Sequence, residues 1–200
     1  MDGTTAVFGN DVPFEVDFGD ILEKVNIALS VNMELNNGTW FAIVDPMYTE
    51  LEMQITKGPI GGQIDINLII LDALLGHSVT EKVDVFAGVR YYDQEITVIP
   101  NLLSKQDLGD DWVDFVVGGR VTTELNERWG FTARLDVAAA GDSDSAWYAQ
   151  AMFSRYIGDN KNLNIGYRHY DVDYESGSGL SRFKWDTAHS GLIFGFSWEF

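Results

Sequence analysis

Apolar and polar residues alternate along most of the chain with a period of two, which predicts β-strands with side chains on alternate faces. The clearest case is 25–35, where Val25, Leu29 and Leu35 share an apolar face. We expect further strands over 40–51, 63–77, 83–98, 112–125, 129–140, 147–157, 163–174 and 183–200. A buried helix competes at 63–77, the most apolar segment, but its β-branched residues and its neighbours favour a strand.

The segments between these strands are alternately short and long. The short ones are 36–39, 78–82, 126–128 and 158–161, and the long ones are 52–62, 99–110, 141–146 and 175–182. Short turns at one end and longer loops at the other are typical of outer-membrane barrels, whereas a soluble barrel has no reason to sort its loops so regularly. The sequence therefore predicts an all-β, antiparallel up-and-down transmembrane β-barrel in one domain, 25–200.

The number of predicted strands is odd. Nine strands are clear, but single-chain bacterial barrels have even numbers, so we expect ten strands by design. Residues 1–24 are then an external loop or the remnant of a first strand. We expect the native chain to cross the membrane before residue 1, unless residues 4–18 fold back to fill the gap. The Val25 strand and the Phe200 strand should then lie across an imperfectly paired seam.

The last strand carries a band of large apolar residues on one face. These are Leu192, Phe194, Phe196, Trp198 and Phe200. A soluble edge strand is normally blunted by Lys, Pro or a bulge, and this one is not. The segment resembles the C-terminal strand of bacterial outer-membrane barrels, which the assembly machinery recognises in that family.

Charge and composition exclude several classes of function. The net charge of −18 argues against nucleic acid, because phosphate binding needs clustered Lys and Arg. There is no cysteine, so disulfides and thiol chemistry are excluded. The run Gly141–Ser145 resembles part of a calcium loop but lacks its spacing and closing Glu, so we expect no metal and no cofactor.

Charged residues inside the predicted strands share the face opposite the apolar band. An Arg facing lipid near mid-membrane costs about 2–4 kcal/mol, so this face must line the lumen. The expected lumen network is Arg90, Arg120, Arg134 and Arg168 with Asp45, Asp84, Asp114 and Asp136. It is either a lattice of salt bridges that fills the lumen or, as the alternative, a polar pathway or binding site.

A set of short motifs adds a resemblance that covers the chain from Phe14 onward. They are Asp111-Trp112-Val113-Asp114, Gly88-Val89-Arg90-Tyr91, Gly166-Tyr167-Arg168, Asp171-Val172-Asp173-Tyr174 and Ser190-Gly191-Leu192-Ile193-Phe194-Gly195. In this order the chain resembles a family of uncharacterised proteobacterial outer-membrane β-barrel proteins, small barrels of the OmpA and OmpW kind. The resemblance implies the fold and an outer-membrane location, and it implies no reaction.

We therefore expect an outer-membrane protein with a structural or passive small-solute transport role and a narrow, salt-bridged lumen. Its partners should be the lipid bilayer and the assembly machinery, with no nucleic acid, and it should be a monomer. The alternatives are a barrel that holds a small apolar ligand and an outer-membrane hydrolase. We expect no enzyme, because Ser190 faces away from the inward His189 and cannot be its nucleophile.

Overall fold

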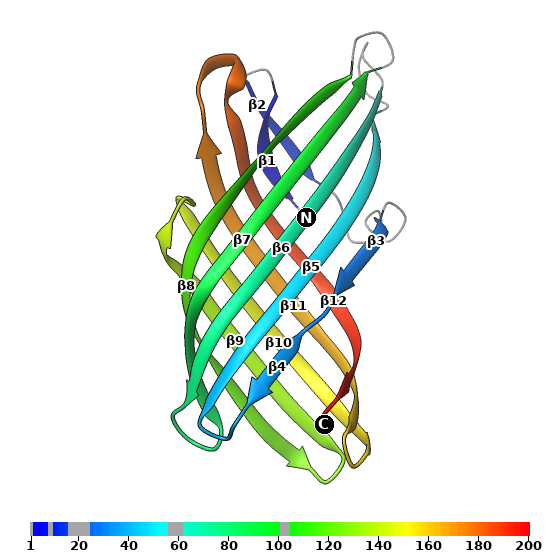
Figure 1. Cartoon of the computed structure of the whole chain (residues 1–200). Helices are drawn as coiled ribbons and strands as arrows, with labels where there is room; N and C mark the ends of the chain where they lie inside the picture. The colour runs from blue at the N-terminus through cyan, green and yellow to red at the C-terminus, as the bar shows by residue number, and fades with distance from the viewer. Residues whose placement is uncertain (1, 8–9, 16–24, 56–61, 101–104) are drawn as a thin grey trace.

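The computed structural model describes residues 2–7, 10–15, 25–55, 62–100 and 105–200, and these form one antiparallel sheet that curls into a barrel-like wall (Figure 1). The long strands are β5 (Trp40–Ile55), β6 (Gly62–Ser78), β7 (Val83–Pro100), β8 (Gln106–Asn126), β9 (Trp129–Gly141), β10 (Ser145–Gly158), β11 (Lys161–Ser176) and β12 (Phe183–Trp198). The shorter elements are β1 (Asp2–Val7), β2 (Asn10–Glu15), β3 (Val25–Ser30), β4 (Met33–Asn36) and the 3₁₀ turn η1 (Gly179–Ser181). The predicted antiparallel up-and-down all-β fold is confirmed, including a strand at 63–77.

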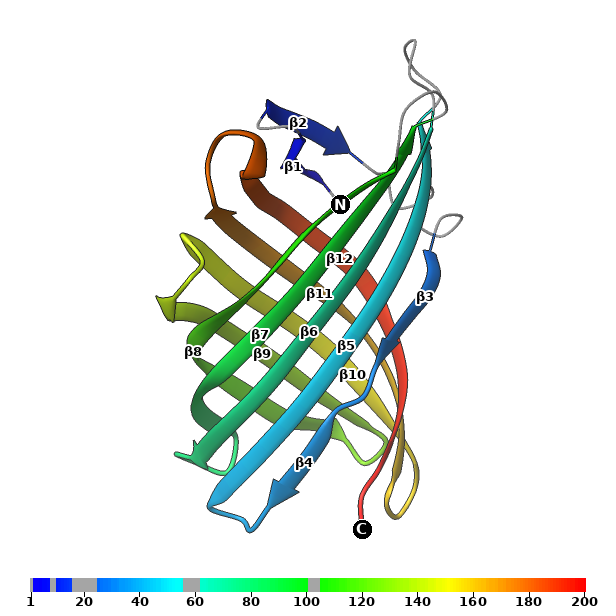
Figure 2. The same cartoon turned by 45° about the horizontal axis from the view of Figure 1, so that its top comes forward.

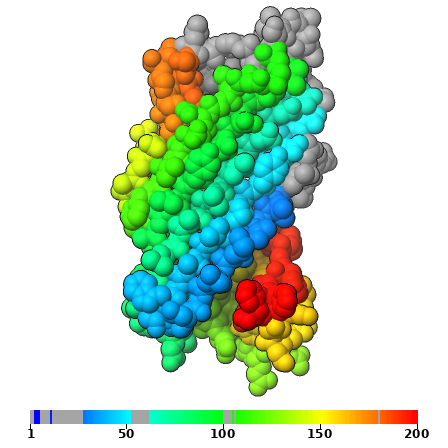
Figure 3. Space-filling view, in the orientation of Figure 1, coloured from blue at the N-terminus to red at the C-terminus, as the bar shows by residue number. Residues whose placement is uncertain are grey.

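Each strand from β5 to β12 pairs with its neighbours in sequence, and β3 and β4 both pair with β5. The hairpin of β1 and β2 joins the other side, where β1 pairs with β12 from Asp2↔Ala188 to Thr5↔Trp185. Within the described residues the ladder ends at β2 and at β3, which do not pair, so the sheet is open. One edge of β12 pairs with β11 along the whole strand, and no described strand pairs with the other edge beyond Ala188. On the face that Figure 3 draws, the C-terminal segment (red) is seen next to the β3–β4 edge (blue).

β3 and β4 are two parts of one edge strand that is interrupted opposite Pro46. The Val31 N–H donates to the Pro46 carbonyl at 3.0 Å, but Pro46 has no N–H to return. The register of β5 on β6 passes through Pro46 without a shift. Pro46 therefore causes no bulge in its own pairing with β6, and the irregularity falls on the neighbouring strand.

The connections are sorted by length between the two ends of the barrel-like wall. The four short turns and the C-terminus lie at one end, and the longer connections and the β1–β2 hairpin lie at the other (Figures 1 and 2). Two expected loops are shorter than the sequence indicated, because β5 continues to Ile55 and β7 to Pro100. The rest of those loops, 56–61 and 101–104, and residues 16–24 of the expected N-terminal loop lie outside the described residues.

Side chains pack the interior in two apolar clusters. The larger cluster lies toward the loop end and contains three stacked rings, with centroids 4.8 Å apart for Tyr92 and Trp112 and 4.1 Å apart for Trp112 and Tyr174. The smaller cluster consists of Phe41, Ile43, Leu74, Phe86 and Val116. In the described part of the chain, no helix is long and apolar enough to cross a membrane.

Candidate functional site

Two arginines and two aspartates meet in the interior between the two apolar clusters, and we call them the central charge cluster. Arg90 on β7 lies opposite Asp72 on β6 and binds it with two hydrogen bonds, Nε to Oδ1 at 2.6 Å and Nη2 to Oδ2 at 2.9 Å. Arg134 on β9 donates to Asp136 from Nε at 2.8 Å and to Asp72 from Nη2 at 2.7 Å. Arg90, Asp72 and Asp136 are at most 1 % exposed and Arg134 is 8 % exposed.

The cluster is neutral overall, because each guanidinium is matched by one carboxylate. A fourth contact places Asp136 Oδ1 at 3.0 Å from Arg90 Nη2, which is an ion-pair distance without hydrogen-bond geometry. Opposite charges inside an apolar interior are tolerated only when they are paired in this way. The cluster thus joins β6, β7 and β9 through side chains as well as through the sheet.

Aromatic rings enclose the two guanidinium groups. The Arg90 guanidinium carbon lies 5.4 Å from the Tyr148 ring centroid and 5.1 Å from that of Tyr170. Arg134 lies 4.7 Å from Tyr148 and 5.0 Å from Phe86. A cation over an aromatic face within about 6 Å is attracted by the ring, so these contacts add to the ion pairs and fill the space around them.

A second ion-pair group lies nearer the short-turn end. Arg120 on β8 donates to Asp84 on β7 at 2.9 Å, and its other nitrogens donate to Glu34 on β4 at 2.5 and 3.1 Å. β4 and β8 are separated in the sheet by β5, β6 and β7. The Glu34–Arg120 pair therefore crosses the concave side of the sheet and ties its edge to its middle.

Three of the predicted network residues do not join an Arg–Asp pair. Asp114 is fully buried, and its Oδ1 accepts the backbone N–H groups of Asp142 and Ser143 at 3.1 and 3.0 Å. Asp45 accepts from Ser30 at 3.2 Å and from Asn32 at 3.0 Å. No carboxylate among the described residues forms an ion pair with Arg168. In the described part of the chain, Asp45 and Asp114 therefore bind donors other than arginine, and Arg168 lies outside both ion-pair groups.

Sequence reasoning missed two carboxylates that the clusters use, Asp72 and Glu34. Asp72 lies in an otherwise apolar run, where polar and apolar residues do not alternate, so the sequence does not show which face of the strand it is on. A usable signal existed, because a charge in the middle of such a run must face the interior if the other face meets lipid. Glu34 is polar in phase with the predicted inner face, but nothing in the sequence places it opposite Arg120 across the three intervening strands.

The predicted assembly residues lie on the outer face of β12 and at the C-terminus. Leu192, Phe194, Phe196, Trp198 and Phe200 are each more than half exposed. They continue the outward-facing apolar positions of the other strands, such as Val89 and Leu135.

The histidines divide between the two faces. His189 faces the interior, where its Nε2 lies 2.7 Å from the Thr187 hydroxyl. His169 faces outward, and its Nδ1 lies 2.6 Å from Ser190 Oγ on the neighbouring strand. The His77 ring contacts Trp40 edge-on with centroids 4.8 Å apart. Ser190, which faces away from His189, therefore has His169 as its hydrogen-bond partner.

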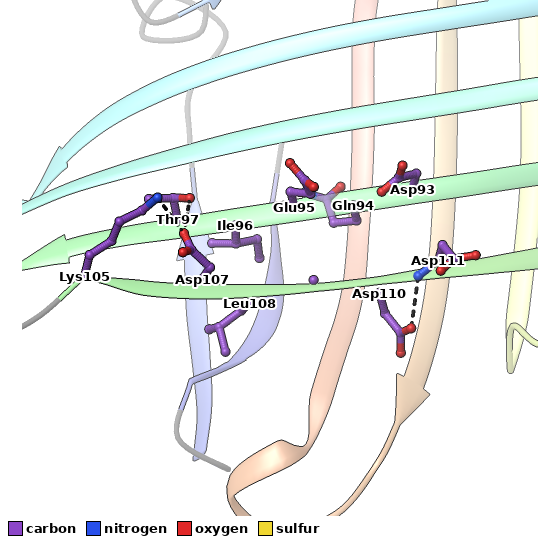
Figure 4. Close-up of a pocket in the computed structure, with 11 residues that line it drawn as sticks. Asp93, Gln94, Glu95, Ile96, Thr97, Lys105, Asp107, Leu108, Asp110 and Asp111 are labelled. Carbon is purple, nitrogen blue, oxygen red and sulfur yellow. Dashed lines mark hydrogen bonds and ion pairs between the residues drawn. The ribbon is translucent and has the colours of Figure 1, made fainter.

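An acidic groove of about 640 Å³ lies along the loop ends of β7 and β8 (Figure 4). Two of its carboxylates are engaged locally: Asp107 accepts from Lys105 at 2.9 Å and from Thr97 at 2.8 Å, and Asp110 accepts from Tyr174 at 3.0 Å. Within the described ranges, no group of three or more His, Cys, Asp or Glu side chains is arranged to hold a metal ion.

Comparison of the chain with protein-family models and with curated proteins finds no match. The function is therefore argued from the geometry of the chain itself.

Proposed function

We propose that this chain is an outer-membrane β-barrel protein with a structural role, whose interior is closed to solutes. The observation that carries the proposal is the distribution of side chains on the wall. Every long strand exposes large apolar residues on its outer face, while the buried charges of the central charge cluster point inward and are paired. A water-soluble barrel has the opposite need, since its outer face must be polar.

The outer apolar positions recur along the strands at the spacing that a lipid-facing surface requires. They include Ile69, Leu71, Leu75, Val85, Val89, Val113, Phe115, Val117, Leu135, Val137, Phe153, Ile165, Tyr167, Leu192 and Phe194. Soluble monomers rarely expose continuous apolar patches beyond a few hundred Å². Trp40, Trp129, Trp147 and Trp198 lie near strand ends, where interfacial aromatics of membrane proteins are found.

The interior favours a structural role over passive transport. The central charge cluster and its rings occupy the middle, and the stacked rings of Tyr92, Trp112 and Tyr174 occupy the loop end. Small barrels hold just enough interior space for side chains to fill it. A solute would have to break buried ion pairs in order to pass.

Two measurements on the refolded full chain test the proposal. The folded protein should migrate faster than the boiled protein on a detergent gel, as membrane barrels do, and it should insert into phospholipid vesicles. In planar bilayers it should give no steady conductance, whereas Arg90→Ala combined with Arg134→Ala should open a small conductance. A steady conductance of the unchanged protein would show a transport role, and failure to enter vesicles would overturn the membrane placement.

The proposed partners are the bilayer and the outer-membrane assembly machinery, which would engage the exposed face of β12. The backbone edge of β12 below Ala188 has no strand partner among the described residues, and an unpaired edge is costly in hydrocarbon. A membrane-embedded form therefore requires that this edge approach β3 and β4 or be covered by another strand.

A further inference from the structure

A serine, a histidine and an aspartate are aligned on the outer face of β11 and β12. His169 lies directly opposite Ser190 in the antiparallel register, and the two side chains share a hydrogen bond of 2.6 Å between Nδ1 and Oγ. The other ring nitrogen faces Asp171, with Nε2 4.0 Å from Oδ2. A nucleophile within hydrogen-bond reach of a base, and a carboxylate beside that base, is the arrangement of an activated serine.

The position of this group along the strand matches the depth of lipid ester bonds. Ser190 precedes Phe200 by ten residues. At about 3.4 Å per residue and a tilt of about 45°, Ser190 lies about 24 Å above the C-terminal end, near the outer rim of an apolar belt about 25 Å tall. Below it β12 exposes Leu192 and Phe194, while above it the same face carries Asp186.

The surroundings of Ser190 hold the imidazole in place and provide a backbone hydrogen-bond donor. The Trp147 ring packs on His169 with centroids 4.5 Å apart and holds the imidazole in place. Ser190 lies just beyond the last residue of β12 that pairs with β1. Because successive backbone N–H groups of a strand point to opposite sides, either Ser190 or Gly191 directs an N–H toward this open edge. Such a donor can stabilise an oxyanion.

We propose that Ser190 and His169 are the catalytic residues of an acyl-ester hydrolase acting on lipids of the outer leaflet. Access to the lipid rests on the membrane placement proposed above. Ser190 Oγ attacks the ester carbonyl carbon while His169 takes the hydroxyl proton, and collapse of the tetrahedral intermediate breaks the ester C–O bond. His169 returns the proton to the departing alcohol, and water, activated by His169, then releases the fatty acid from Ser190. Asp171 is a positioning residue that favours the imidazolium form during each transfer.

The experiment uses the refolded full chain in phospholipid vesicles, with and without an acylated glycolipid such as lipid A. Free fatty acid is measured by mass spectrometry, and a fluorophosphonate probe tests for a reactive serine. We expect release from one or both vesicle types and labelling of Ser190. Ser190→Ala and His169→Asn should each lower the release rate at least 100-fold, and Asp171→Asn should lower kcat while leaving KM unchanged.

Ser145→Ala and His77→Asn are matched controls that should keep full activity, and the gel shift shows that each variant folds. The vesicle type that releases fatty acid identifies the lipid. A folded, inserted protein that releases no fatty acid from either vesicle, labelled or not, overturns the hydrolase and leaves the membrane placement standing. Hydrolysis of p-nitrophenyl butyrate that depends on Ser190, in a protein that does not enter vesicles, overturns the membrane placement instead.

Discussion

At the scale of single residues, the interior depends on charges that cannot be removed one at a time. Arg90 is fully buried and binds Asp72, and it lies within ion-pair distance of Asp136. Removing it leaves two buried carboxylates to share Arg134, and a buried charge without its partner costs far more than the pair itself contributes.

We predict that Arg90→Met lowers the free energy of unfolding by about 3–5 kcal/mol, the range found when one partner of a buried ion pair is removed. Arg155→Met is the control, because Arg155 lies on the exposed outer face, where its guanidinium carbon is 5.8 Å from the centre of the Trp129 ring. Urea unfolding in vesicles, followed by Trp fluorescence, measures both. Equal losses for the two variants would contradict the role of the cluster.

A second prediction concerns Glu175, which lies at the loop end of β11, beyond the roughly ten residues that a strand needs to cross a bilayer. Arg182 donates to both of its carboxylate oxygens, at 2.7 and 2.8 Å, and also pairs with Asp11 of β2. These hydrogen bonds hold the pKa of Glu175 below its ordinary value of 4.5. Because the folded pKa is the lower one, the stabilisation is complete above pH 4.5 and is lost as the pH falls through the folded pKa.

Glu175→Gln should therefore lower the Tm slightly at pH 7, and the difference from the unchanged protein should vanish in acid. Thermal melts between pH 7 and pH 3 check this. A difference that stays constant over the whole range would show that the carboxylate charge has no part in the contact.

At the scale of one strand, the two faces should differ sharply in what they tolerate. Leu29 and Ser30 are neighbours on β3, but Leu29 is 60 % exposed on the outer face, whereas Ser30 binds Asp45 on the inner side. We predict that Leu29→Arg, Val117→Arg or Phe194→Arg costs about 2–4 kcal/mol in the bilayer and blocks assembly. Ser30→Arg and Thr132→Arg should be milder. Vesicle insertion yields measure the effect, and equal tolerance of both sets would exclude a lipid-facing surface.

Most of the strands could be predicted from the alternation of apolar and polar residues. A period of two indicates that a segment is a strand, and it also indicates which face of the strand is apolar. The eight long strands and the interrupted β3–β4 strand were therefore visible in the sequence. The β1–β2 hairpin was not, since its short, irregular pattern around Pro13 is supported by pairing with a strand far along the chain. Tertiary pairing also extended β7 and β8 into a segment expected to be a loop.

The candidate sites were harder to predict, because they depend on which strands face each other. The alternation of side chains alone places Arg90, Arg134 and Asp136 on the inner face. It does not place their partner Asp72, and it does not pair Glu34 with Arg120, because that contact depends on how the sheet curves. Alternation places both Ser190 and His169 on the outer face, but the register of β11 on β12 was needed to join them. Equal counting from the ends of the expected loop, 175–182, would pair His169 with Ala188, because in the structure β11 continues to Ser176, which lies opposite Phe183.

At the scale of the whole molecule, the pairing of β1 with β12 is the contact that joins the first described strand to the last. Thr4 lies opposite Asp186, both on the outer face, and the chain has no cysteine of its own. We predict that the double variant Thr4→Cys with Asp186→Cys forms a disulfide on mild oxidation, because directly opposed residues lie about 4.5–5.5 Å apart between Cα atoms. Gel mobility with and without reductant measures it.

Thr4→Cys with Lys184→Cys is the matched control, since it is displaced by two residues and should cross-link much less. Efficient cross-linking of the control in preference to the opposed pair would mean that the register of the hairpin differs from the one described.

The order of strands in the sheet also sets the order of events in folding. From β3 to β12, neighbours in the wall are close in sequence, whereas β1 and β12 are separated by almost the whole chain. Hairpins close short loops and form early, while a contact across so many residues must wait until its two sides have been brought near each other. Until β1 arrives, the whole edge of β12 that faces away from β11 is bare, and a second chain can add to it. β1 then covers only the stretch from Trp185 to Ala188, so on that edge the aromatic part of β12 beyond Ala188 still has no partner among the described strands. This part of the edge is therefore where the protein is most prone to aggregate, both before and after β1 pairs.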